Sequence, residues 1–175
     1  NWIKRFRKKN PHTKILFHFA GLSRVSADKD FILKRLMSDL KKHFEIPHDI
    51  PDKPQKLAQL FTSWLYLVSS REKLVLVIDG LEQITDIDGR AEFPFPISEI
   101  PPNLRIIASS TPEPNLEKFR DLGWELVGLE PLSTDERKAF IRNFLEMHSS
   151  PVDFGNFEGI AFAPHTGNPF FLRMI

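Results

Sequence analysis

The chain has 175 residues, with 24 Lys and Arg against 23 Asp and Glu, 41% apolar residues and no Cys. This length allows one domain, or one domain and a small appendage, with a substantial core. The near-neutral charge argues against a surface devoted to nucleic acid or anionic lipid, and the apolar runs are much shorter than the roughly 20 residues that span a bilayer. The absence of Cys excludes disulfide scaffolds and thiol nucleophiles and suits a reducing compartment, so we expect a cytoplasmic protein.

The first ten residues predict the end of a basic helix. Trp2, Ile3 and Phe6 fall on one helical face, five Lys and Arg residues cover the rest, and Pro11 ends the pattern. The aromatic residues are expected to contact the core. The segment has neither an initiator Met nor the apolar region of a signal peptide, so we expect the chain to begin inside a longer protein.

Strands and helices are predicted to alternate along the rest of the chain. Continuous apolar runs predict strands at residues 14–20, 74–78, 104–108 and 125–129. Apolar residues at helical spacing predict helices after the N-cap Asp28, at 57–68, at 116–122 and after the capping box Ser133 to Glu136. Such alternation predicts an α/β fold with a parallel sheet between layers of helices, each strand being covered on both faces. We expect this core at residues 1–130 and a helical appendage at 131–175.

Several common site motifs are absent from the sequence. No glycine is followed by Lys, which excludes a phosphate-binding loop of the G-x-x-x-x-G-K-[ST] type within this chain. No two glycines are separated by one residue, which excludes the dinucleotide fingerprint. The six His residues never lie three or four positions apart, so the helical zinc-protease motif is absent as well.

Asp79 is the strongest candidate for a functional residue. It follows the apolar run 74–78, and ligands of parallel sheets bind at the carboxyl ends of the strands. Glu82, three residues later, could orient or deprotonate a water molecule while Asp79 holds a magnesium-bound water. The alternative is that Asp79 and Gly80 only form a turn and that Glu82 is a solvated residue at the start of a helix.

Three hydroxyl residues follow the next predicted strand. Ser109, Ser110 and Thr111 would lie beside Asp79 if the strands at 74–78 and 104–108 are neighbours. In that position they could contact a phosphate group. The alternative is that they begin a turn with Pro112.

Five segments, in this order along the chain, resemble a known family. Leu74 to Gln83 (LVLVIDGLEQ) resembles the Walker B segment of the STAND class of P-loop NTPases, in particular the NACHT group with its nephrocystin-like and telomerase-associated relatives. The other segments resemble the strand and loop after the P-loop helix, the sensor 1 strand, the entry to the helical lid and the lid's GNP-type motif. They lie at residues 18–26, 104–112, 129–133 and 166–172, respectively.

The resemblance implies a P-loop-type core that lacks its P-loop strand, with the start of a lid domain behind it. The missing strand would lie between the strands at 104–108 and 125–129, so we expect a gap inside the sheet. The parent protein would bind ATP or GTP with Mg²⁺ and use the nucleotide to control self-association and signalling through flanking domains. Asp79 would position the metal through water and Glu82 would be the candidate base. The nucleotide-binding residues would be Ser109, Ser110, Thr111 and Pro169, the last packing near the base.

Two departures from the family pattern leave the activity open. Gln83 stands where NACHT proteins usually carry a further acid, and Thr111 stands where an Arg is common. Hydrolysis in the parent is therefore an open question, and this chain alone is expected to be inactive. The main alternative is a protein-interaction scaffold that no longer uses nucleotide. Nucleic-acid binding through the basic start is a third hypothesis, weakened because a solvated helix face explains the same charges.

Overall fold

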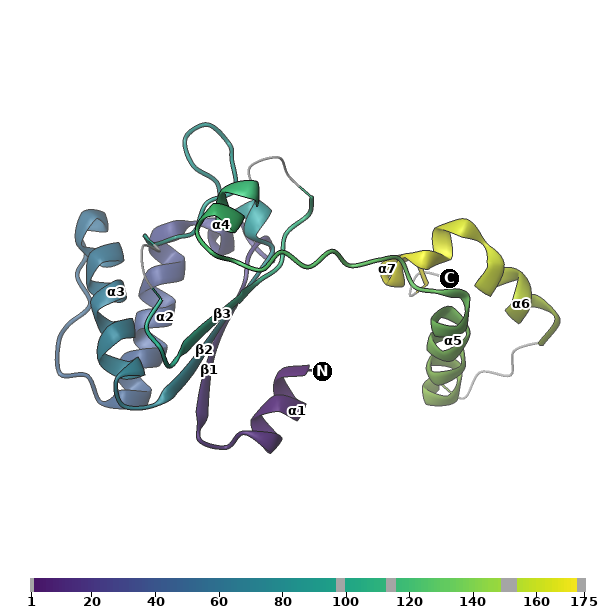
Figure 1. Cartoon of the computed structure of the whole chain (residues 1–175), viewed down its shortest axis with the longest axis horizontal. Coiled ribbons are helices and arrows are strands. Elements are labelled where there is room, and N and C mark those ends of the chain that lie inside the picture. The colour runs from purple at the N-terminus through teal and green to yellow at the C-terminus, as the bar shows by residue number, and fades with distance from the viewer. Residues whose placement is uncertain (1, 97–99, 113–115, 149–153, 173–175) are drawn as a thin grey trace. The chain divides into compact units, whose positions relative to one another are not determined.

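The computed structural model describes residues 2–96, 100–112, 116–148 and 154–172 (Figure 1). The chain forms two compact units, residues 1–125 and residues 126–175. The first unit contains a three-stranded sheet with β1 (Thr13–Phe19), β2 (Lys73–Asp79) and β3 (Leu104–Ala108) in the order β1-β2-β3. Both pairings are parallel, and helices flank the sheet. The predicted α/β fold with a parallel sheet is confirmed.

Two long helices connect β1 to β2. α2 (Lys29–Phe44) begins after Asp28, whose carboxylate accepts a hydrogen bond of 2.8 Å from the Phe31 N–H, as expected of the predicted N-cap. α3 (Pro54–Ser69) has Pro54 at its first position, where the missing N–H costs no helical hydrogen bond. Short 3₁₀ turns η1 (Arg24–Ala27) and η2 (Leu81–Gln83) follow β1 and β2, and α4 (Glu117–Asp121) follows β3.

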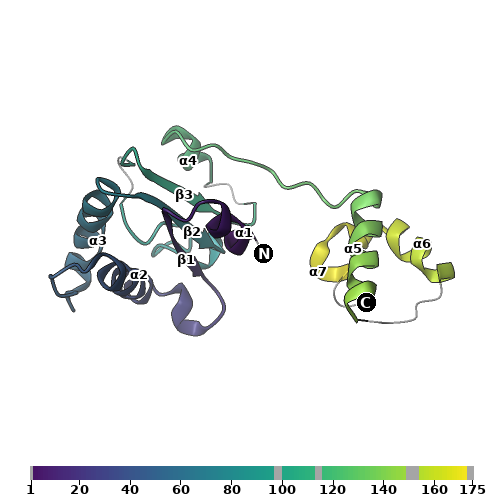
Figure 2. The ribbon, with the colours of Figure 1, turned by 90° about the horizontal axis from the view of Figure 1, so that it is seen from below.

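The core lies on one face of this sheet. Figures 1 and 2 show α2 and α3 on one side of the strands and α1 (Trp2–Lys9) on the other. On the side of α2 and α3, Leu16 pairs with Leu76, and Leu76 pairs with Ile106 across the ladder. Leu76 is fully buried there, together with Leu36 and Phe61 of the two helices. Burial of this face supplies most of the apolar stabilisation of the unit.

The opposite face is covered only in part. Ile15 and Val75 are buried on it, but Ile107 of β3 is 46% exposed. α1 contacts β1, where the Arg7 guanidinium lies 5.7 Å from the centre of the Phe17 ring. The expectation that every strand is covered on both faces was wrong for β3, because α1 packs beside β1 and does not extend over the sheet. Trp2 is 45% exposed, so the predicted core contact of this residue was also wrong.

The predicted strand at residues 125–129 does not form. This segment has no regular secondary structure, and Val127 and Leu129 are mostly exposed. A strand exists through ladder hydrogen bonds to a neighbour, and the segment has no such partner among the described residues. The predicted gap inside the sheet is therefore absent, since the described sheet ends at β3.

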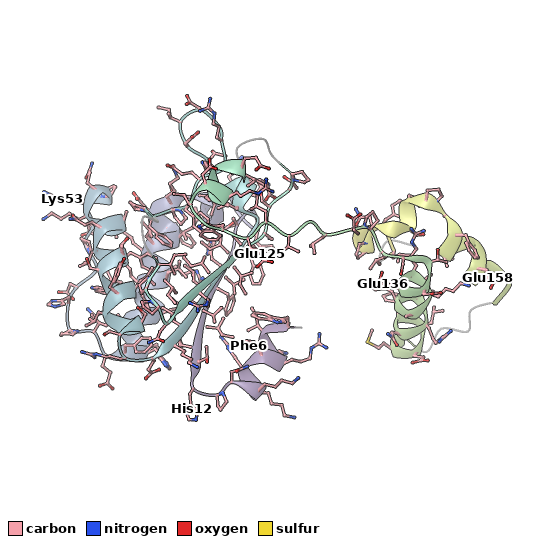
Figure 3. The ribbon with its side chains drawn as sticks, in the orientation of Figure 1. Phe6, His12, Lys53, Glu125, Glu136 and Glu158 are labelled. Carbon is pink, nitrogen blue, oxygen red and sulfur yellow. The ribbon has the colours of Figure 1, made fainter. Side chains whose placement is uncertain are left out.

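The second unit is helical in its described part. It contains α5 (Thr134–His148), α6 (Phe154–Phe162), the 3₁₀ turn η4 (Pro164–Gly167) and α7 (Pro169–Leu172). The predicted capping box is confirmed: Glu136 Oε2 accepts from the Ser133 N–H at 2.8 Å, and the Glu136 N–H donates to Ser133 Oγ at 3.3 Å. Hydrogen bonds to the Glu136 carboxylate from the Ser133 N–H, and also from the Ser133 hydroxyl at 2.8 Å, hold the pKa of Glu136 below its ordinary value. Figure 3 shows Glu136 on the first turn of α5.

Arg137 holds the helices of the second unit together. Its Nε donates to the Leu132 carbonyl at 2.7 Å, and its Nη1 donates to the carbonyls of Ala161 and Ala163 at the end of α6, each at 3.2 Å. Charged donors at a helix C-terminus are favourable because the last carbonyls have no partner inside the helix. A Cβ on Gly167 would lie 3.1 Å from Arg137 Nη2, so the turn after α6 fits closely around this guanidinium.

Two isoleucines of adjacent strands test the difference between the two faces of the sheet. Ile78 is fully buried on the covered face, whereas Ile107 is 46% exposed on the other. Ile78→Ala should lower the free energy of unfolding by about 2 to 5 kcal/mol through lost burial and the cavity left behind. Ile107→Ala should cost less than about 1 kcal/mol. Urea denaturation of both variants measures this, and equal losses would show that the face of Ile107 is also packed.

Candidate functional site

The candidate site is built at the carboxyl ends of β2 and β3. Asp79 is the last residue of β2 and is exposed, while its backbone carbonyl accepts from the Ala20 N–H at 2.8 Å. β3 lies directly beside β2, with Ile78 paired to Ala108, so residues 109–111 follow at the same edge of the sheet. The arrangement that the Asp79 hypothesis requires, with the two strands adjacent and the carboxylate exposed, is present.

Ser109 joins the ends of the two strands. Its hydroxyl donates to Asp79 Oδ1 and accepts from the Gly80 N–H at 3.1 Å. Its backbone continues the ladder, because its carbonyl accepts from the Leu81 N–H at 2.8 Å. The hydroxyl hydrogen is thereby used on Asp79. Ser109 orients the carboxylate in this structure, and its hydroxyl is not a spare donor for a phosphate.

Glu82 is connected to the loop that follows β3. Its Oε2 accepts from the Thr111 N–H at 3.3 Å, and its Oε1 accepts from Gln83 Nε2 at 3.4 Å. These two contacts hold the half-exposed carboxylate on the same edge as Asp79. Four of the predicted site residues therefore lie at one end of the sheet in two hydrogen-bonded pairs, Asp79 with Ser109 and Glu82 with Thr111.

Ser110 differs from its neighbours. Its Oγ is covered and has no hydrogen-bond partner among the described residues, whereas Thr111 is exposed. A covered hydroxyl without a partner costs about 1 to 3 kcal/mol, which calls for an explanation in a native structure. The sequence could not distinguish the three hydroxyls, since their environments depend on how the end of β3 meets β2.

Gln83 packs against the loop after β1. A Cβ built on Gly21 would lie 3.0 Å from Cγ of Gln83, so the glycine lets the two loops come close. Gly80 is equally restricted, with a φ of 80° and the Ala20 carbonyl oxygen 3.1 Å from a built Cβ. The two glycines allow the turns after β1 and β2 to lie close against each other.

A buried histidine, not predicted as functional, anchors the loop after β1. His18 is 4% exposed, its Nδ1 accepts from Arg35 Nε at 3.2 Å, and its Nε2 lies 2.6 Å from the Ser26 carbonyl. Arg35 can only donate, so Nδ1 carries no hydrogen and Nε2 donates to Ser26. Arg35 also donates to the Phe17 carbonyl and forms an ion pair with Asp39. The neutral ring therefore ties β1, η1 and α2 together.

Burial lowers the pKa of His18 below its ordinary value of 6.5, and the positive charge of Arg35 lowers it further. The hydrogen bond to the Ser26 carbonyl acts in the opposite direction. A polar residue inside the apolar run 14–20 was the only sequence signal for this contact, because the partners Ser26 and Arg35 are brought to it by the fold.

The arrangement at Asp79 suits a Mg²⁺ ion whose remaining ligands are water molecules and the phosphates of a bound substrate. The described residues contain no group of three or more His, Asp or Glu that could form a complete metal cage. Mg²⁺ usually keeps several waters and is held by one or two carboxylates together with substrate phosphates. One exposed, oriented carboxylate at Asp79 fits that mode of binding.

Pro169, predicted to lie near a nucleotide base, belongs to the second unit. It is exposed at the start of α7, two residues after the buried Thr166 and Gly167 of η4. The Thr166 hydroxyl hydrogen-bonds within this unit, at 2.9 Å to the Ile160 carbonyl. The turn that presents Pro169 is thus held by contacts inside the second unit.

Comparison with known proteins gives distant relatives. The chain is 31% identical to human nephrocystin-3 over 154 residues, which cover 86% of this chain and 11% of the relative. It is 30% identical to mouse nephrocystin-3, over 80% of this chain, and 24% identical over its whole length to a TPR repeat-containing protein from Dictyostelium discoideum. No family profile and no solved structure matches. The chain is distantly homologous to these proteins and spans about a tenth of their length.

The helices give no sign of a membrane segment. Among the described residues, none is both long and apolar enough to cross a bilayer.

The His18 anchor predicts a pH-dependent stability. Because the pKa of His18 is lowered in the folded chain, the unfolded chain binds the proton more tightly. The contribution of His18 is complete above pH 6.5 and is lost as the pH falls from there through the lowered pKa. Urea denaturation between pH 7.5 and pH 5 should show this decrease, and His18→Gln should flatten it. His12→Gln, at an exposed position, is the control and should leave the slope unchanged.

The Gly80 turn is tested by comparison with Gly89. Both have positive φ, 80° and 77°, but a Cβ at Gly89 would meet nothing within 4 Å. Alanine at either position should cost roughly 1 kcal/mol of backbone strain. Gly80→Ala should cost measurably more, because of the Ala20 carbonyl. Equal losses in thermal or urea unfolding would contradict the close approach of the two turns.

Proposed function

We propose that this chain is part of a nucleotide-binding signalling switch of the STAND class, of the NACHT type, that binds ATP or GTP with Mg²⁺ and controls self-association. The observation that carries the proposal is the edge of the sheet at which Asp79 is hydrogen-bonded to Ser109 and Glu82 to Thr111. The homology to nephrocystin-3 supports it, since the proposed family includes nephrocystin-like proteins. The protein would act in the cytoplasm.

In this proposal Asp79 and Glu82 have different roles, one toward the metal ion and one toward the attacking water. Asp79 is exposed and oriented by Ser109, so it can hold a water molecule of a Mg²⁺ ion that the nucleotide phosphates also bind. Bound Mg²⁺ would neutralise charge on the phosphates. Glu82 is held by the Thr111 N–H beside Asp79, where it can accept a proton from an attacking water molecule.

The remaining residues would contact the nucleotide itself. The covered Ser110 hydroxyl lacks a partner among the described residues, which is consistent with a group that acts on a phosphate only in the complete site. Thr111 is exposed next to Glu82. Residues 131–175 would belong to a lid, with Pro169 at the nucleotide base. The phosphate-binding loop, which this sequence does not contain, would come from elsewhere in the full-length protein.

A scaffold that does not use nucleotide is the second candidate function. Gln83 favours it, because the NACHT pattern usually has a further acid at this position. The Gln83 side chain instead packs against Gly21 and donates a hydrogen bond to Glu82. Thr111 favours it too, since an Arg there would add a cation to a phosphate site. In that case the fold would serve only to present surfaces to protein partners.

The test uses the full-length protein and the variant Asp79→Asn. Loss of the charge should weaken Mg²⁺-dependent ATP or GTP binding by about tenfold or more, measured by calorimetry with and without Mg²⁺. If the protein hydrolyses the nucleotide, Glu82→Gln should lower the rate by roughly 10² to 10⁴ with little change in affinity.

Asp88→Asn is the matched control, because Asp88 is exposed and its ion pair with Arg90, across 3.7 Å, involves no residue of the candidate site. It should leave nucleotide binding unchanged. Affinity that is the same in the wild type and in Asp79→Asn would remove the metal role of Asp79. A wild-type protein that binds neither nucleotide would favour the scaffold.

A further inference from the structure

A pocket of about 320 Å³ lies between the start of α2, the loop before β3 and α4. Its lining includes none of the residues at the ends of β2 and β3 that form the candidate site. Figure 1 shows α4 near the carboxyl ends of the strands. The volume falls at the small end of the range of cavities that hold low-molecular-weight ligands, roughly 300 to 1,000 Å³.

Aromatic rings form the floor of this pocket. Phe93, Phe95 and Phe119 are each at most 7% exposed, and the Phe93 ring contacts Phe119 edge to face at 5.5 Å and Phe95 at 5.9 Å. Packing against Trp124 at 5.0 Å holds Phe93 from another side. Leu122, 56% exposed, lines the rim. The floor is apolar and its rings pack closely against one another, and such a surface suits contact with the edge or face of a flat ring.

The charges around the floor do not cancel. Lys29 forms an ion pair with Glu92, so these two side chains compensate each other. Lys118 forms no ion pair in the part of the chain that is described; its ammonium donates to the Ala91 carbonyl at 2.8 Å and lies 5.2 Å from the centre of the Phe119 ring.

The charge of Lys118 also acts on the Asp86 carboxylate, but that carboxylate already accepts two backbone hydrogen bonds. The N–H of Arg90 is the main cause of the lowered pKa of Asp86, and the charge of Lys118 contributes only weakly. The Asp86 Oδ1 accepts from the backbone N–H of Asp88 and of Arg90, at 2.9 and 2.8 Å. Of the two lysines that line the pocket, Lys29 is compensated by Glu92, whereas Lys118 has no ion pair among the described residues. The Lys118 ammonium is held at the edge of the aromatic floor by the Ala91 carbonyl and the Phe119 ring.

We propose that this pocket binds a small ligand that combines one aromatic ring with a carboxylate. The ring would lie on Phe93 and Phe119 beneath the rim at Leu122, and the carboxylate would accept a charge-assisted hydrogen bond from the Lys118 ammonium. A cationic group is disfavoured at the same position by the charge of Lys118. A neutral ligand would gain only the apolar contact.

Three probes that differ only in their head group test the proposal: 3-phenylpropionate, 3-phenylpropanol and 3-phenylpropylamine. Their binding to the whole chain is measured by calorimetry, and ¹H–¹⁵N chemical-shift changes at residues 92, 93, 95 and 117–122 locate it. The carboxylate should bind about tenfold more tightly than the alcohol, and the amine most weakly. No binding of any probe at millimolar concentration, or equal binding of all three, would overturn the proposal.

Substitutions at Lys118 identify the cation. Lys118→Gln should abolish the preference for the carboxylate and leave the alcohol affinity within about twofold, while Lys118→Glu should reverse the order of carboxylate and amine. Lys56→Gln, at an exposed position of α3, is the matched control and should keep the wild-type order. Thermal unfolding checks that each variant is folded. A carboxylate preference that survives in folded Lys118→Gln would refute the role of Lys118.

Discussion

The parallel pairing of β2 with β3 is the constraint on which the candidate site depends. It places the residues after Ile78 and after Ala108 at the same edge of the sheet, where the Ser109 hydroxyl reaches the Asp79 carboxylate. A shift in this register would separate the two side chains and would also break the hydrogen bond from Leu81 to the Ser109 carbonyl. The site is therefore a consequence of strand order and register, which the apolar side chains of the covered face determine.

The distribution of burial explains why polar groups can gather at that edge. Leu76 and Ile78 are fully buried under α2 and α3, and they hold β2 rigidly up to the residue before Asp79. Beyond that residue the chain turns at Gly80 into η2, and the Asp79 side chain is exposed. A rigid strand followed by an exposed carboxylate is an arrangement that can position a ligand without a large loss of conformational freedom on binding.

The loop after β1 is held in a different way, by one buried polar contact. His18 connects the strand to Ser26 and, through Arg35, to α2, and this network needs the ring to be neutral. Gln83 lies over the same loop at Gly21, so the loop also supports the residue next to Glu82. The stability of this loop and the placement of the candidate base are thereby linked. The aromatic pocket at Lys118 is independent of that link, since it shares none of these residues.

The sequence by itself determined the elements that local patterns specify: the three apolar strands, the Asp28 cap, the capping box at Ser133 and the parallel α/β class. It also indicated Asp79 and Glu82, because an acid directly after an apolar run needs no tertiary information to be noticed. It could not show that residues 125–129 stay outside the sheet, since an apolar run becomes a strand only if a neighbour is available. Nor could it distinguish the roles of Ser109 and Ser110 or find the partners of His18 and Lys118. These contacts join residues far apart in the chain, and only the packing of helices and loops around the sheet decides which of them meet.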